Sequence, residues 1–302
     1  MSTLAKKSDP SDAEEPLYMP RSDVPFYLML LVLGGVYVVL LVGMLAADVV
    51  YMMTSDGTDT FALPAWLEWA RVVLRPVLGM LAALGKPEIQ YSIKLTMISC
   101  FFTAILSVLV AVPLGYSLSR FRFPGRTLLD AMLDIPIVLP PLVVGLSLLI
   151  LFQFWPFNLA SGMVVYKIPA VILAQFMVAA AFAVRTMRAT FDQIDPRPEQ
   201  VALTLGCNHG QAFRMVAFPL ARQGMVTAGT LSWARALGEF GPLLIFAGAT
   251  RNKTEVLSTT VFLELSIGNL EAAVAVSLIM VLAAMIVLVI ARVWGTGSLG
   301  RI

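Results

Sequence analysis

The uncharged stretch Leu95-Thr-Met-Ile-Ser-Cys-Phe-Phe-Thr-Ala-Ile-Leu-Ser-Val-Leu-Val-Ala-Val-Pro-Leu-Gly-Tyr-Ser-Leu118 decides the fold class. A helix needs about 20 mostly apolar residues to cross the hydrocarbon core of a bilayer, and this stretch meets that length without one charged side chain. We therefore predict a membrane-spanning helix here.

Composition extends this prediction to the whole chain. Of its 302 residues, 59% are hydrophobic and 13% are charged, and the mean hydropathy is +0.85. Soluble domains are roughly 45–50% apolar and about 25% charged. Further apolar runs cover residues 26–47, 135–154, 168–184, 224–249 and 272–290. The prediction is an all-α polytopic membrane protein with six transmembrane helices.

The distribution of basic residues predicts the orientation. With the N-terminus inside, most of the 21 Lys and Arg residues fall in cytoplasmic segments, as the positive-inside rule requires. Both termini are then cytoplasmic. We expect a disordered cytoplasmic tail at residues 1–24 and a cytoplasmic tail at residues 294–302. Residues 25–90 should hold the first span and an extracytoplasmic segment, in which 64–84 forms an interfacial helix because charges interrupt its apolar pattern. A seventh, poor span is the alternative for 64–84.

Composition also excludes several function classes. A net charge of +2 does not favour nucleic-acid binding. Two cysteines cannot build a disulfide framework, and one histidine is too few for a histidine-based metal site. The stretch 79–86 has the wrong glycine spacing for a phosphate-binding loop. We expect no catalytic residues, no metal and no cofactor in this chain, so it is not predicted to be an enzyme.

The most specific local pattern lies between residues 195 and 219. Asp195 is placed to cap a first short helix, Gly206 to end it in a left-handed conformation, and Asn208 to cap a second helix. Pro219 is expected to follow the end of that second helix. Such a helix–turn–helix either docks into a groove on a soluble partner or packs on its own bundle.

This loop resembles the EAA loop of ABC importer permeases. Counting from Gly206, Gln200-Val201-Ala202 takes the place of the Glu-Ala-Ala tripeptide, Val216 that of the Ile and Phe218-Pro219 that of the Leu-Pro. Gln200 departs from the pattern, and Glu199 stands one position early. The resemblance implies that loop 191–222 couples to a cytoplasmic ATPase. The residues it assigns to that contact are Glu199, Gln200, Val201, Ala202, Gly206, Phe213, Val216 and Pro219.

Three other stretches, 92–126, 134–145 and 233–248, are similar to the molybdate, tungstate and sulfate permeases of this family. The most selective is Ala234-Arg-Ala-Leu-Gly-Glu-Phe-Gly241. The resemblance implies a type I ABC importer permease core over residues 91–293, in a bacterial or archaeal plasma membrane, carrying a tetrahedral oxyanion, molybdate first. Implied partners are two ATPase subunits holding ATP and Mg, a second permease copy or paralogue, an extracytoplasmic solute-binding protein and membrane lipid, but no nucleic acid.

Candidate pathway residues follow from backbone chemistry and charge. Prolines remove backbone donors, and broken helices at membrane depth are tolerated only against protein or a water-filled cavity. Intramembrane charges are costly, and Arg235 and Glu239 share one helix face. The pair is therefore either a gate or subunit-interface element or a structural ion pair that locks two helices. The candidates are Pro136, Pro140, Pro141, Ser232, Arg235 and Glu239. Alternatives for the whole chain are an ABC permease for phosphate or an amino acid, and an ATP-independent channel or secondary transporter.

Overall fold

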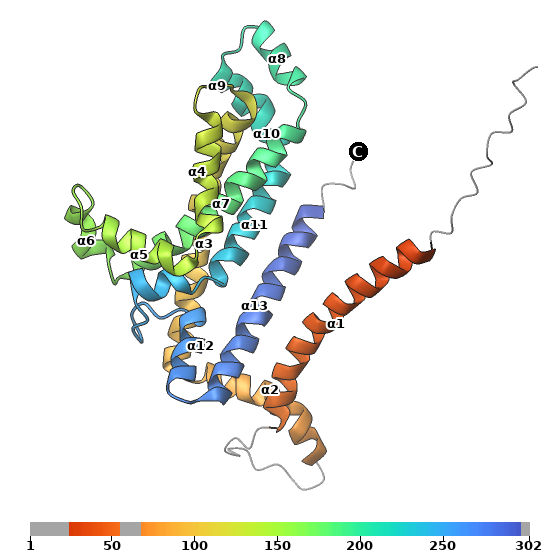
Figure 1. The fold of residues 1–302 in the computed structure, drawn as a ribbon, viewed down its shortest axis with the longest axis vertical. Helices are drawn as coiled ribbons and strands as arrows, with labels where there is room; N and C mark the ends of the chain where they lie inside the picture. Colours follow the sequence, from red (N-terminus) through yellow and green to blue (C-terminus); the bar gives the residue numbers. More distant parts are fainter. Residues whose placement is uncertain (1–23, 55–67, 297–302) are drawn as a thin grey trace, which may run out of the picture. The chain divides into compact units, whose positions relative to one another are not determined.

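The computed structural model describes residues 24–54 and 68–296, and every regular element in these ranges is helical (Figure 1). The chain divides into two compact units, Met1–Asp48 and Val49–Ile302. The described part of the first unit consists of most of α1 (Val24–Thr54). The side chains of this helix are largely exposed, which is typical of a helix that contacts lipid or another chain. The predicted tails lie outside the described residues, except for position 24 and the end of the last helix.

The second unit contains the remaining helices. In chain order they are α2 (Glu68–Leu84), α3 (Pro87–Arg120), α4 (Arg126–Val138), α5 (Pro141–Leu151), α6 (Asn158–Val164), α7 (Ile168–Gln193), α8 (Arg197–Thr204), α9 (His209–Ala212), η2 (Phe213–Ala217), α10 (Phe218–Leu220), α11 (Arg222–Leu237), η3 (Leu243–Ala247), α12 (Leu257–Ser266) and α13 (Leu270–Thr296). The elements η2 and η3 are π-helical turns.

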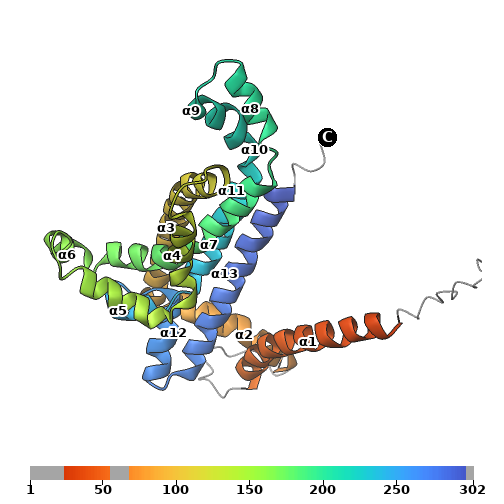
Figure 2. The ribbon, with the colours of Figure 1, turned by 45° about the horizontal axis from the view of Figure 1, so that its top comes forward.

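The centre of this unit is the contact of α3, α7 and α11, which run side by side in Figures 1 and 2. Small side chains let these helices approach closely, which is the usual solution within a membrane, where hydrophobicity does not favour helix association. A Cβ built on Gly115 of α3 would lie 2.8 Å from the backbone nitrogen of Arg188 on α7. The buried alanines of α7 are Ala170, Ala174, Ala179, Ala181 and Ala183.

Two of the six predicted spans are not single straight helices. The run 135–154 is bent by 112° between α4 and α5, because Leu139 precedes a proline and takes an extended conformation. The run 224–249 is divided into α11 and η3 at Gly238. Within the described ranges, four helices are long and apolar enough to cross a membrane, or five with the bent pair, so helix length alone does not confirm six spans.

Two other predicted elements differ less from the structure. The predicted run 168–184 is the first part of α7, which continues to Gln193. The predicted interfacial segment 64–84 is helical from Glu68 onward and packs against α13 and α3 through Ala83 and Leu84. With 17 residues, this helix is shorter than the helices that are long enough to cross a membrane.

Candidate functional site: the 195–221 loop and the α5–η3 contact

The loop between α7 and α11 consists of two helical arms joined by a glycine turn. Gly206 has a φ of +94°, the left-handed conformation predicted for it, and the amide of Cys207 donates to Ala202 O at 3.1 Å. Asn208 caps the second arm through a reciprocal pair of hydrogen bonds with Gln211 at 2.8 and 2.9 Å. Asp195 Oδ1 accepts from the amide of Arg197 at 2.9 Å. The predictions for Gly206 and Asn208 are confirmed. The prediction for Asp195 is wrong in position, because Pro196 is the cap residue of α8 and has no side-chain cap bond, while Asp195 lies one residue earlier.

The predicted helix end at Pro219 is wrong. The second arm continues from α9 through η2 into α10, and Pro219 lies inside it. Proline has no amide hydrogen, and its ring clashes with the carbonyl four residues earlier in an α-helix. The π-helical turn η2, in which the Phe218 amide donates to Phe213 O, widens the helix directly before the proline. The sequence pattern could not show this change of helix type.

The inward face of the loop is held by the last turn of α3. Arg120 Nε donates to Glu199 Oε1 at 3.0 Å, and its Nη2 lies 2.9 Å from the same oxygen. Arg120 Nη2 also donates to Ile194 O at 2.8 Å, and Tyr116 Oη donates to Glu199 Oε2 at 2.9 Å. Glu199 is buried, and Arg120 of the same chain compensates its charge.

Aromatic rings hold the second arm to the same place. The ring of Phe213 lies 4.6 Å from that of Tyr116 and 6.4 Å from that of Phe191, centroid to centroid. Ala202 and Val216 are half-buried. Phe213, which the family resemblance assigns to the ATPase contact, therefore has much of its surface against its own bundle.

The outward face of the loop has large exposed apolar side chains among polar ones. Leu205, at the tip of the first arm, is 81% exposed, and Val201 and Met215 are also exposed. Gln200 lies on the exposed side as well. The loop therefore has one face fixed to α3 and α7 and one apolar face free to meet another surface.

The second part of the site is the α5–η3 contact, where Gly145 on α5 meets Gly241 and Pro242 directly before η3. A Cβ on Gly145 of α5 would lie 2.7 Å from Pro242 Cα, and one on Gly241 would lie 2.9 Å from the backbone nitrogen of Leu142. Pro140 and Pro141 are exposed at the start of α5, and Pro136 is half-buried in α4. The structure thus brings the two proline–glycine stretches of the sequence analysis into direct backbone contact.

The pair Arg235–Glu239 lies next to this contact. Arg235 Nη1 is 2.6 Å from Glu239 Oε2, and the guanidinium carbon is 5.8 Å from the centroid of the Phe182 ring on α7. The side chain of Glu239 is 2% exposed, and Ser258 Oγ donates to its backbone oxygen at 2.6 Å. Ser232 is buried against α7, where its Oγ donates to Ala179 O at 3.4 Å. The arginine is thus the more accessible member of the pair.

Comparison with known proteins places this helical arrangement in a family. Residues 107–296 match the family described as "Binding-protein-dependent transport system inner membrane component". The chain belongs to this family. It is an ABC importer permease, a multi-pass transport subunit and not an enzyme.

The permease has sequence relatives with named substrates. It is 34% identical over 67% of its length to the sulfate transport system permease protein CysT of Salmonella typhimurium, covering 75% of that protein. It is 33% identical over 56% of its length to the molybdate/tungstate transport system permease protein WtpB of Thermococcus kodakarensis, covering 65% of that protein.

The permease fold also resembles solved structures. A chain from the crystal structure of a bacterial ABC transporter involved in the import of the acidic polysaccharide alginate superposes with a TM-score of 0.66, covering 90% of the permease and 95% of that chain at 16% identity. A second such structure, in complex with an alginate pentasaccharide-bound periplasmic protein, gives 0.67 at 15% identity. At these identities the likeness concerns the fold alone.

Sequence analysis missed three residues that organise the permease. Tyr116 and Arg120 hold the loop, and the signal that could have found them is their i, i+4 spacing at the end of a span. Gln175 is a buried amide in α7 that donates to Ala236 O at 3.2 Å and accepts from Thr103 at 3.3 Å, so it joins three helices. A lone amide in an apolar run indicates such an internal bond.

Two ion pairs join α4 to α7. Asp130 pairs with Arg188, and Asp134 pairs with Arg185 at 2.5 Å. Both acids lie on α4 and both arginines on α7, so the pairs join two antiparallel helices near their predicted cytoplasmic ends. Sequence spacing alone favours local partners and cannot reveal this packing.

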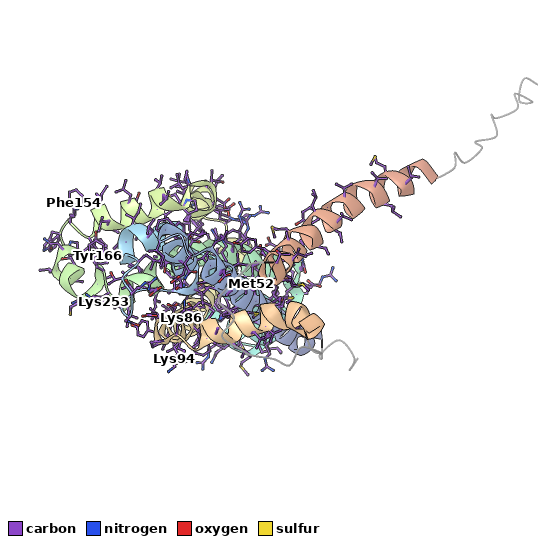
Figure 3. The ribbon with its side chains drawn as sticks, turned by 90° about the horizontal axis from the view of Figure 1, so that it is seen from below. Met52, Lys86, Lys94, Phe154, Tyr166 and Lys253 are labelled. Carbon is purple, nitrogen blue, oxygen red and sulfur yellow. The ribbon has the colours of Figure 1, made fainter. Side chains whose placement is uncertain are left out.

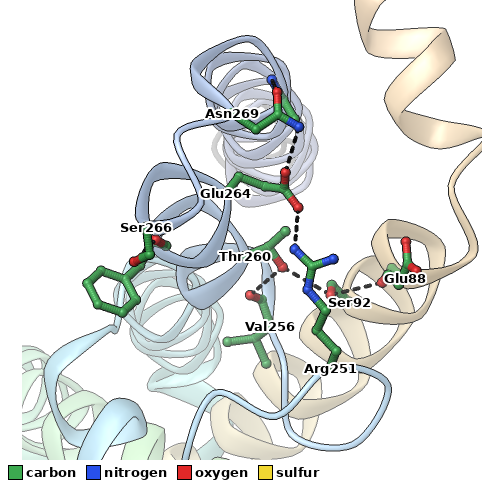
Figure 4. Close-up of polar contacts among 10 residues, drawn as sticks. Glu88, Ser92, Arg251, Val256, Thr260, Glu264, Ser266 and Asn269 are labelled. Carbon is green, nitrogen blue, oxygen red and sulfur yellow. Dashed lines mark hydrogen bonds and ion pairs between the residues drawn. The ribbon is translucent and has the colours of Figure 1, made fainter.

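The predicted extracytoplasmic end of the second unit is polar and partly buried. Figure 3 views the molecule from this end, where Lys86, Lys94 and Lys253 are exposed. Figure 4 shows the network beneath: Arg251 Nη2 donates to Glu264 at 2.7 Å, Asn269 donates to the same carboxylate at 2.9 Å, and Thr260 donates to Ser92 at 3.0 Å. These bonds tie α12 to α3 and to the loop before α12.

Glu255, in that loop, differs from its neighbours. It is 1% exposed, and both of its carboxylate oxygens are buried. Burial raises the pKa of this carboxyl above its ordinary value, while a hydrogen bond from Thr260 and the charge of Arg251 oppose the shift and Glu264 adds to it. The described residues contain no group of three His, Cys, Asp or Glu side chains that could hold a metal ion.

Proposed function

We propose that the chain is the permease subunit of an ATP-driven importer for a tetrahedral oxyanion, with molybdate the first candidate and tungstate and sulfate next. The observation that carries the proposal is the similarity, at 33–34% identity over more than half of the chain, to permeases named for sulfate and for molybdate/tungstate. The relatives include bacterial and archaeal proteins, so the proposed location is the plasma membrane of a bacterium or archaeon.

The proposed partners follow from the family and the loop. The match to a binding-protein-dependent system supports an extracytoplasmic solute-binding protein as one partner. The exposed apolar face formed by Val201, Leu205 and Met215 fits a groove on a cytoplasmic ATPase. Two such ATPases and a second permease copy or paralogue would complete the importer, and ATP and Mg would bind to the ATPases. The permease core is proposed to cover 91–293, with loop 191–222 as its coupling element.

The α5–η3 contact is the proposed gate. Rigid proline–glycine backbone at a bend can shift between packed arrangements when the helices on either side move. The charge of Arg235 is compensated by Glu239, so a passing divalent anion would be held weakly and could leave again. Selection among oxyanions is then proposed to reside in the binding protein.

Purification and binding test this function against its alternatives. The permease is expressed with its genomic neighbours, and a cytoplasmic ATPase is expected to co-purify with it. Absence of any ATPase, together with uptake that needs no ATP, would support a channel or secondary transporter. The partner binding protein is then tested by isothermal titration with molybdate, tungstate, sulfate, phosphate and amino acids. Tight binding of phosphate or an amino acid, with none of the first three, would overturn the oxyanion assignment.

A further inference from the structure

The last turn of α3 has two side chains that contact both arms of the loop. Tyr116 and Arg120 are four residues apart and therefore lie on one face of the helix. Their functional groups meet on one carboxylate, that of Glu199 in the first turn of α8. The ring of Tyr116 packs against Phe213 in the second arm, so a single helical turn touches both arms.

The contacts also include the helix that enters the loop. Arg120 Nη2 donates to Ile194 O, the residue directly after α7, and the Tyr116 ring lies 5.4 Å from that of Phe191 on α7. Arg120 is thus bonded at once to the end of α7 and to the start of α8. The planar guanidinium can serve both acceptors because its donors point in fixed directions, which a lysine ammonium cannot reproduce.

Burial makes this cluster stiff. The side chains of Arg120 and Glu199 are 13% and 8% exposed. Separating two such charges would leave each of them desolvated without a partner, so the arrangement resists partial opening. The loop is therefore joined to α3 and α7 as one body, and not only through its chain connection.

We propose that Tyr116, Arg120 and Glu199 form a clamp that transmits displacement of the loop to α3 and α7. This inference rests on the proposed function, because it assigns the route by which an ATPase moving the exposed face would reach the membrane helices. Glu199 acts within the chain and not as a direct contact to the ATPase. All three are positioning residues: the exposed apolar face meets the partner, and the clamp converts that contact into helix movement.

The test uses the assembled complex of permease, ATPase and binding protein in proteoliposomes, with labelled molybdate, sulfate or tungstate uptake and ATP hydrolysis measured together. The variants are Arg120→Ala, Glu199→Gln, Tyr116→Phe and Arg120→Ala with Glu199→Gln. Arg122→Ala, an exposed arginine two residues along, is the control. Each single variant of Arg120 or Glu199 should lower uptake per ATP hydrolysed roughly tenfold, within the range of measured coupling between linked sites.

The double variant decides the mechanism. The effects of residues that act through each other are non-additive. The double variant should therefore lower uptake per ATP hydrolysed no further than the more impaired of the two single variants. Independent losses that multiply, or a loss with Glu199→Gln but none with Arg120→Ala, would overturn the clamp and support a direct Glu199–ATPase contact. If Arg120→Ala fails to assemble, the volume-preserving Tyr116→Phe and Glu199→Gln carry the test, and unchanged uptake per ATP in both would overturn it. Failure of the wild-type complex to take up any oxyanion would instead count against the proposed function.

Discussion

Substitution of Gly145 by alanine tests the α5–η3 contact at atomic scale. The added Cβ would lie 2.7 Å from Pro242 Cα, 2.9 Å from its carbonyl oxygen and 3.2 Å from its carbonyl carbon, whereas ordinary contacts begin at 3.4 Å. All three atoms are backbone, so no side-chain rotation relieves the overlap. Helix α5 or η3 must move, and overpacking of this kind costs about 1–3 kcal/mol.

The neighbouring helix α6 supplies a matched control. Gly162 in α6 has no atom within 4 Å of its built Cβ. Alanine favours helix over glycine by roughly 0.5–1 kcal/mol, so Gly162→Ala should be neutral or slightly stabilising. Both variants add one methyl group to a helical glycine, and they differ in the atoms that this methyl group contacts.

The assay is thermal unfolding of the purified protein in one detergent, with both variants and wild type measured in parallel. Gly145→Ala should unfold at a clearly lower temperature than Gly162→Ala. Equal unfolding temperatures for the two variants would refute the close backbone contact between α5 and η3.

Three further outcomes are expected. Gly206→Val should lower stability by about 1–2 kcal/mol in thermal unfolding, because its φ of +94° disfavours a side chain, while Gly210→Ala in the same loop should not. Burial raises the Glu255 pKa, so the folded state holds its proton to higher pH than the unfolded state, and stability falls as pH rises through that window. Glu255→Gln should therefore flatten this pH dependence in unfolding measured across the acidic to neutral range; an unchanged slope would contradict the assignment. Leu205→Asp should abolish ATPase co-purification without lowering the unfolding temperature, since Leu205 is exposed; retained co-purification would contradict the docking face.

Local signals in the sequence were sufficient for much of this fold. Apolar run length identified the cores of α3, α7 and α13, and turn chemistry identified the Gly206 elbow and the Asn208 cap. Each depends on the properties of residues close together in the chain, which is why they could be predicted. The proline run after residue 135 also indicated a break in that span.

The remaining features depend on contacts between distant residues. The size of the bend between α4 and α5 and the close approach of Gly145 to Pro242 arise from tertiary packing. The partners of Glu199 come from α3, about eighty residues earlier in the chain, and no periodicity connects them. The π-helical turn before Pro219 is likewise invisible to a pattern that assumes 3.6 residues per turn.

The most direct test of the central claim is ATP-driven uptake by the reconstituted importer. Proteoliposomes containing the permease and its ATPase, with the binding protein on the extracytoplasmic side, are given labelled molybdate, tungstate or sulfate with ATP or with a non-hydrolysable analogue. We expect at least one of these anions to accumulate only with ATP, only with the binding protein, and not with Leu205→Asp. Uptake that proceeds without ATP hydrolysis, or transport of none of the three anions by an assembled and ATP-hydrolysing complex, would contradict the account.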